Sequence, residues 1–75
     1  MNYYITFPST FEAMRFWRAA RSEGLDGVLG PAPLSVQRSC AVAWITTPEK
    51  RVAALETAER YGIPIVATVE QGAAR

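Results

Sequence analysis

The chain of 75 residues contains no histidine and a single cysteine, Cys40. Without histidine it lacks the usual general base at neutral pH and the commonest zinc ligand, which excludes a Cys/His or Ser/His dyad and argues against a zinc site. One cysteine cannot form an intramolecular disulfide, so a disulfide-stapled secreted scaffold is ruled out and a reducing compartment is favoured. We therefore expect a cytoplasmic protein with no cofactor and no metal.

An excess of charge of one sign is also missing. Eight Lys and Arg residues face seven Asp and Glu residues, which leaves a net charge of +1. A nearly neutral chain is not drawn electrostatically to nucleic acid or to an anionic membrane, and no apolar run approaches the ~20 residues of a membrane span. Neither nucleic acid nor a membrane is therefore expected as a partner.

What the chain does contain is typical of a small globular domain. Hydrophobic residues make up 49% of it and charged residues 20%, a balance that favours a packed core over disorder. A length of 75 residues is enough for one domain. We expect that domain to span residues 1–70 and to be followed by a flexible tail, residues 71–75.

Six secondary-structure elements are predicted. Runs of aromatic and β-branched residues predict the strands, and Ser9 with Glu12 has the spacing of a capping box at the start of the first helix. Gly24 and Gly62 stand where left-handed C-caps are needed. The predicted strands are 3–8, 25–30, 40–46 and 64–69, and the predicted helices are 10–23 and 48–61.

Helical spacing indicates which side chains each helix buries. The first helix is expected to bury Ala13, Phe16, Trp17 and Ala20, and the second Val52, Leu55 and Ala58. With right-handed crossovers, the order β, α, β, β, α, β predicts an α+β fold. This is the ferredoxin-like βαββαβ sandwich, a four-stranded antiparallel sheet with both helices on one face.

The other face of this sheet carries no charge. Strand alternation turns five side chains away from the helices: Tyr4, Thr6, Ala41, Ala43 and Ile45. Because a large uncharged face is unusual for a monomer, it favours sheet-to-sheet packing in a homo-oligomer.

Cys40 is the only soft nucleophile, and two interpretations of it remain open. It stands between a proline-containing loop and an inner strand, where Arg38 could stabilise its thiolate. Alternatively it is a small buried side chain, because it shares strand parity with Val42 and Trp44, which are expected to face the core. On physical grounds burial is the simpler interpretation.

Two further patterns have a structural explanation. Arg15, Arg18 and Arg21 form a basic stripe that could receive an anionic partner, but a nearly neutral chain favours a solvated helix face. Tyr3 and Trp44, with Tyr4, could stack on RNA bases from the central strands. The basic-aromatic consensus of an RNA recognition motif is missing, however, so RNA binding is not expected.

Taken together, several segments resemble one family. The opening from Tyr3 to Thr10, the capped first helix, the proline-containing loop and the pair Ser39-Cys40 are similar to the selenium/sulfur carrier-like family of small bacterial domains. The resemblance runs from about Tyr3 to Glu70. It implies that Cys40 carries sulfur or selenium as a persulfide or selenide.

The resemblance also implies a partner. A carrier exchanges its cargo with a sulfur or selenium donor or acceptor protein and is not itself an enzyme, with Arg38 and the Ser39 amide as candidate stabilisers of the anion. The alternative is a non-catalytic interaction or regulatory module that oligomerises through its open sheet face.

Overall fold

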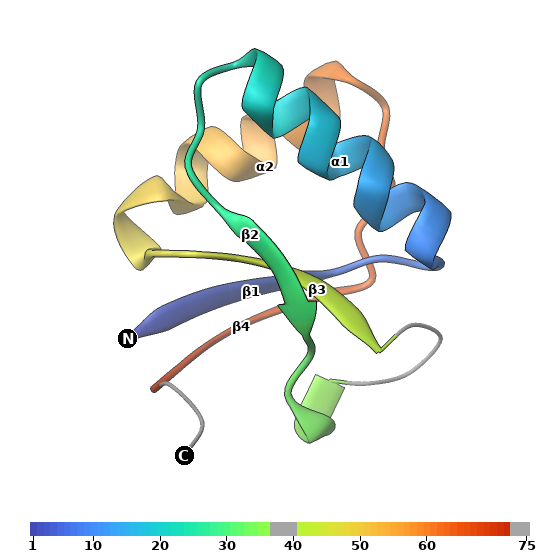
Figure 1. Ribbon diagram of the computed structural model, residues 1–75. Coiled ribbons are helices and arrows are strands. Elements are labelled where there is room, and N and C mark those ends of the chain that lie inside the picture. The colour runs from blue at the N-terminus through green and yellow to red at the C-terminus, as the bar shows by residue number, and fades with distance from the viewer. Residues whose placement is uncertain (37–40, 73–75) are drawn as a thin grey trace.

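The computed structural model describes residues 1–36 and 41–72 and contains the predicted elements in the predicted order. Those elements are β1 (Asn2–Thr6), α1 (Thr10–Ser22), β2 (Val28–Pro31), β3 (Val42–Thr46), α2 (Arg51–Arg60) and β4 (Ala67–Gln71). Two short 3-10 turns, η1 (Leu34–Val36) and η2 (Pro48–Lys50), precede β3 and α2. Both helices lie on one side of the sheet and η1 lies on the other (Figure 1).

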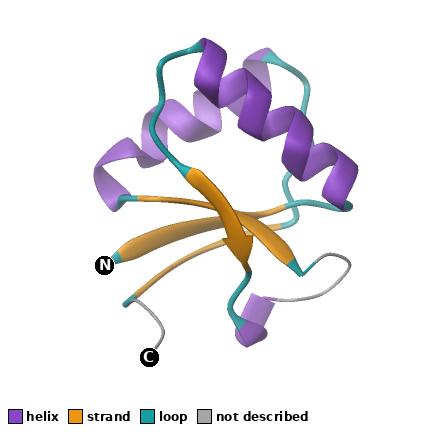
Figure 2. Cartoon of the chain, viewed as in Figure 1, coloured by secondary structure: helices purple, strands orange, loops and turns teal. Residues whose placement is uncertain are grey.

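The four strands form one antiparallel sheet in the order β2-β3-β1-β4. β1 lies between β3 and β4. Its last residue, Thr6, is paired with Ala43 of β3 on one side and with Ala67 of β4 on the other. Each helix crosses over the sheet between two of its strands (Figure 2). The predicted ferredoxin-like α+β sandwich is therefore confirmed.

Helix α1 begins and ends for the reasons expected from its sequence. Ser9 has extended backbone angles, and its hydroxyl accepts a hydrogen bond of 3.3 Å from the amide of Glu12. The carboxylate of Glu12 in turn accepts a bond of 2.6 Å from Arg15. At the other end, Gly24 has a φ of 71°, the left-handed conformation that lets the chain leave the helix.

Helix α2 differs from its prediction in both its start and its buried face. The segment opens as the 3-10 turn η2, and the side chain of Thr47 makes no capping bond there. The predicted burial of Val52 and Leu55 is wrong, because these side chains are 61% and 39% exposed. Ala58 is buried as predicted, and the helix also buries two other small residues, Ala54 and Thr57. Short side chains allow a helix to lie close to its neighbours, so the stripe of small residues faces inward.

Two strands begin later than predicted. β2 begins at Val28 rather than at residue 25, because residues 24–27 form a loop after the helix cap. β4 begins at Ala67 rather than at residue 64, since Pro64 has no amide to donate to the sheet. The amide of Val66 nevertheless donates a bond of 2.8 Å to the carbonyl of Thr6, directly before the strand.

The remaining boundaries lie near the two undescribed segments. β3 begins at Val42, and the predicted start of that strand at Cys40 lies outside the described residues. β4 extends to Gln71, which is paired with Asn2, so the first residue of the predicted tail belongs to the sheet. Residues 73–75 lie outside the described part of the chain.

The main core lies between the sheet and the helices. The ring of Phe16 stands 4.9 Å from that of Trp44 in an edge-on contact and 5.3 Å from that of Phe7, centroid to centroid. All three side chains are fully buried. Trp17, predicted to be buried in the core, is only half-buried and packs against its margin.

A second, smaller cluster lies on the opposite face of the sheet. Tyr4 and Ala43 pack there with Ala32, which comes from the segment that follows β2 and folds beneath the sheet. Ile45 and Val69 pack against this cluster and stay partly exposed. The face that the sequence predicts to be open is therefore partly covered by the chain itself.

Candidate functional site at the α1 end of the sheet

The three site residues predicted from the sequence, Arg38, Ser39 and Cys40, lie outside the described residues. The structure does describe the residues on either side of them. Ala41, the next residue after the cysteine, is exposed, and its carbonyl accepts a hydrogen bond of 2.7 Å from the amide of Ala32. This bond extends the pairing of β2 with β3 and holds Ala32 and Ala41 together at the sheet.

β3 begins at the end of the sheet where β1 ends. Because β1 and β3 are antiparallel, with Thr6 opposite Ala43, the start of β3 is on the side where β1 leads into α1. β2 also ends on this side, with Pro31 opposite Val42. The N-terminus of a helix carries a partial positive charge, so this is the electrostatically favourable end for an anion.

A hollow of about 490 Å³ opens on the sheet face that points away from the helices, beside the segment that follows β2. Its wall includes the ring of Tyr4, whose hydroxyl accepts a hydrogen bond of 3.3 Å from the side-chain amide of Asn2. The lining residues are Tyr4, Pro31, Ala32, Pro33, Leu34, Ser35 and Gln71. Sequence reasoning missed this hollow, although the Pro-Ala-Pro run at 31–33 marks a segment that leaves the sheet.

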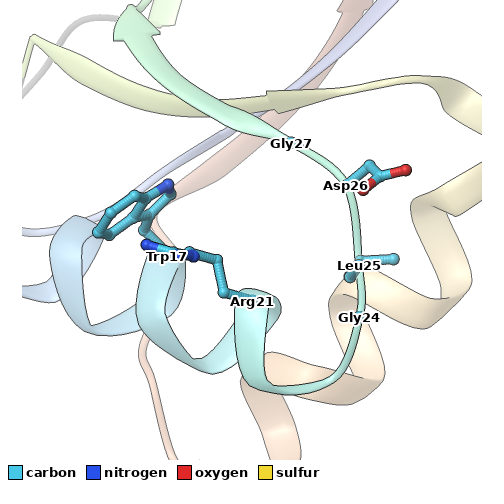
Figure 3. Close-up of a pocket in the computed structure, with 6 residues that line it drawn as sticks. All are labelled: Trp17, Arg21, Gly24, Leu25, Asp26 and Gly27. Carbon is cyan, nitrogen blue, oxygen red and sulfur yellow. The ribbon is translucent and has the colours of Figure 1, made fainter.

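A second hollow, of about 380 Å³, lies at the C-terminal end of α1 (Figure 3). It is lined by Trp17 and Arg21 on the helix and by the loop from Gly24 to Gly27. The guanidinium carbon of Arg21 lies 4.9 Å from the centroid of the Trp17 ring, a cation–π contact. The spacing of four residues between an aromatic and an arginine is the sequence signal for this contact.

The remaining charged groups near the helices are mostly paired. Glu23 at the end of α1 accepts hydrogen bonds from Arg60 at 2.8 Å and from the hydroxyl of Tyr61 at 3.0 Å. Arg51 on α2 binds Glu70 on β4 at 2.6 Å. In residues 1–36 and 41–72, no group of three or more His, Cys, Asp or Glu side chains is arranged to hold a metal ion.

The aromatic residues of the central strands are not placed to stack on bases. Tyr3 and Trp44 are 3% and 0% exposed and face the helices, and Tyr4 is 5% exposed on the other face. Stacking on a nucleic acid requires an accessible ring face. These rings therefore act as core side chains.

Fold and sequence together define the class of this protein. It is a small ferredoxin-like domain with one cysteine, which precedes β3 in the sequence. The chain belongs to the family described as "Putative Se/S carrier protein-like", which it matches over residues 2–70. No curated protein and no solved structure was found to match it. Neither helix of the described residues has the length and apolar character needed to cross a membrane.

Proposed function

We propose that this protein is a carrier that holds one sulfur or selenium atom covalently on Cys40. Membership of the selenium/sulfur carrier-like family carries the proposal, because the chain contains no other cysteine on which the cargo could be held. A thiolate can attack a sulfur donor directly, so the reaction needs no histidine and no metal on the carrier.

The loading step is an exchange without net oxidation. The Cys40 thiolate attacks the outer sulfur of a persulfide on a donor protein. A new sulfur–sulfur bond forms on Cys40, the bond within the donor persulfide breaks, and the donor leaves as a thiolate. A donor that carries selenium in the outer position would transfer it in the same way. In the unloading step an acceptor nucleophile attacks the outer atom, and Cys40 leaves as the thiolate.

The described residues next to positions 37–40 in the sequence support this chemistry. Ala41, to which Cys40 is bonded, is exposed, and β3 begins at the sheet end where α1 begins. A helix N-terminus and a nearby cation both favour a thiolate over a thiol. Arg38 is the candidate cation, and the amide of Ser39 is the candidate hydrogen-bond donor to the loaded anion.

Alkylation of Cys40 by iodoacetamide as a function of pH tests the proposal. For the folded protein we expect the rate to rise around a pH below the ~8.5 of an ordinary cysteine. After exposure to a persulfide donor and removal of excess reagent, intact-mass spectrometry should find the gain of one sulfur atom. The Cys40→Ser variant should gain nothing. A thiol that reacts only in denaturant, and that never gains the cargo atom, would exclude Cys40 from the function.

A second candidate function is a homo-oligomeric interaction or regulatory module that packs through its open sheet face. The observation that favours it is Val28, which lies on this face opposite Ile45 and is 60% exposed. Val69 lies on the same face, on β4 at the opposite edge of the sheet, and is also partly exposed. The remaining apolar surface is narrower than the sequence predicts, because the segment after β2 covers Tyr4 and Ala43.

Sedimentation velocity of a charge variant tests the second function. If this face holds two copies together, Val28→Glu should convert the oligomer to a monomer, because an uncompensated charge is costly to bury. Val52→Glu is the matched control, since Val52 on α2 is 61% exposed and lies on the helical side. A wild-type protein that sediments as a monomer would refute this function and leave the carrier proposal untouched.

A further inference from the structure

The outward surface of α1 combines exposed apolar and cationic side chains. Phe11, Met14, Arg18 and Arg21 follow one another at spacings of three and four residues, so they share one side of the helix. Phe11 is 69% exposed and Met14 is 42% exposed, and both arginines are exposed. These four residues are called the outer face of α1 below.

The positive charge of the outer face is not neutralised within the described part of the chain. Glu12 of this helix binds Arg15, and Glu23, directly after the helix, binds Arg60 of α2. Arg18 makes no hydrogen bond or ion pair with any residue of 1–36 or 41–72. Arg21 lies against the ring of Trp17 and has no carboxylate partner among these residues.

The hollow beside Trp17 continues the outer face toward the end of the helix. In Figure 3, Trp17 and Arg21 line one side of it and the loop from Gly24 to Gly27 lines the other. The carboxylate of Asp26 points away from Arg21 in this view and lies 3.8 Å from the amino group of Lys50. The hollow therefore offers an aromatic wall next to a cation, which suits an apolar side chain that adjoins a carboxylate.

We propose that the outer face of α1 docks an acidic, amphipathic segment of a partner protein. Its carboxylates would pair with Arg18 and Arg21, and its apolar side chains would cover Phe11 and Met14 and enter the hollow. Complementary charge gives such contacts their specificity and speeds association. A nucleic acid is the less suitable partner, because affinity for phosphates grows with the number of cations and only two unpaired arginines lie here.

A synthetic peptide of about 15 residues, helical and with glutamates beside leucines on one side, serves as the probe. Titrated into isotope-labelled protein, it should shift the amide resonances of α1 and saturate. Arg18→Glu should weaken binding by about tenfold, since it replaces attraction by repulsion. Phe11→Ala should weaken it through lost apolar contact, and added salt should weaken it by screening.

Matched controls separate this face from general effects of charge and composition. Arg51→Glu makes the same charge change on α2, and Val52→Ala truncates an apolar side chain there that is 61% exposed. Both should leave the affinity within about twofold of wild type. Circular dichroism should confirm that every variant is folded. Cys40→Ser should bind the peptide as tightly as wild type does, so this proposal stands or falls separately from the carrier function.

Several results would overturn the proposal. They are an absence of saturable peptide binding, equal binding of a peptide with lysines in place of the glutamates, and an equal loss in Arg51→Glu and Arg18→Glu. Tighter binding of a single-stranded RNA oligonucleotide, lost in Arg18→Glu, would assign the face to nucleic acid instead.

Discussion

Gly27 lies directly against the indole ring of Trp44. A Cβ atom placed on Gly27 would overlap Cζ2 and Cε2 of the tryptophan. Trp44 is fully buried, and its Nε1 has no hydrogen-bond partner in the described part of the chain. The loop after α1 thus closes on the core tryptophan only because residue 27 has no side chain.

Gly27→Ala should therefore destabilise the protein by about 1–3 kcal/mol, because the added methyl group overpacks a core contact formed by a rigid ring. Urea denaturation followed by circular dichroism measures this loss. Gly72→Ala is the control, since a Cβ there meets no atom within 4 Å, and it should change the unfolding free energy by less than about 0.5 kcal/mol. Equal midpoints for the two variants would contradict the close contact.

Phe16 and Trp17 are neighbours on α1, yet their truncation should have different costs. Phe16 is fully buried against Phe7 and Trp44, so Phe16→Ala should cost about 3–5 kcal/mol of unfolding free energy. Trp17 is half-buried at the margin of the core, and Trp17→Ala should cost about 1–2 kcal/mol. Chemical denaturation of the pair tests this order, and a larger loss for Trp17→Ala would be evidence against it.

The inward face of α2 can be tested in the same way. Ala54 is fully buried, so Ala54→Leu should overpack the core and destabilise the domain by about 1–3 kcal/mol. Val52, at 61% exposure, should tolerate replacement by Ala with a change below about 0.5 kcal/mol. Thermal unfolding of both variants distinguishes this arrangement from one in which the larger apolar residues face inward.

Glu49 contributes to the stability of the folded domain, and this contribution depends on pH. Hydrogen bonds from its own backbone amide and from Thr47 lower the pKa of the Glu49 carboxyl below its ordinary value of 4.5. Because the pKa is lower in the folded state, the contribution is present above about pH 4.5 and is lost as the pH falls through the folded value. Glu49→Gln should therefore lose less stability than wild type between neutral pH and pH 3.

Denaturation midpoints across this pH range test the prediction. Glu56→Gln removes the same charge from an exposed position on α2 and controls for the change in net charge. Parallel pH profiles for wild type and Glu49→Gln would mean that the hydrogen bonds to Glu49 contribute nothing.

The fold was predictable because its signals are local. The Ser9 cap fixes where α1 begins, Gly24 and Gly62 fix where the two helices end, and the order of elements then leaves few topologies. The buried face of α2 was not predictable in this way. The apolar spacing of Val52 and Leu55 competes there with a stripe of small residues, and only tertiary packing decides between them.

The candidate site was less accessible to sequence reasoning. Cys40 is notable as the only cysteine, but a single residue type does not reveal whether its thiol is reactive or buried. The hollow beneath the sheet depends on residues 31–35 folding back under Tyr4, a contact between segments far apart in the chain. No local pattern specifies such a contact.

The hydrogen bond between Ala32 and Ala41 also affects which changes in the length of the chain are compatible with the fold. The bond holds these two residues together at the sheet, so a change in the number of residues between them would cost little free energy, since doubling the length of a flexible connection adds only about 0.6 kcal/mol of closure entropy. Insertions between Ala32 and Ala41 are therefore compatible with the same fold. The segment that contains the cysteine can diverge in length and sequence while the sandwich that supports it stays unchanged.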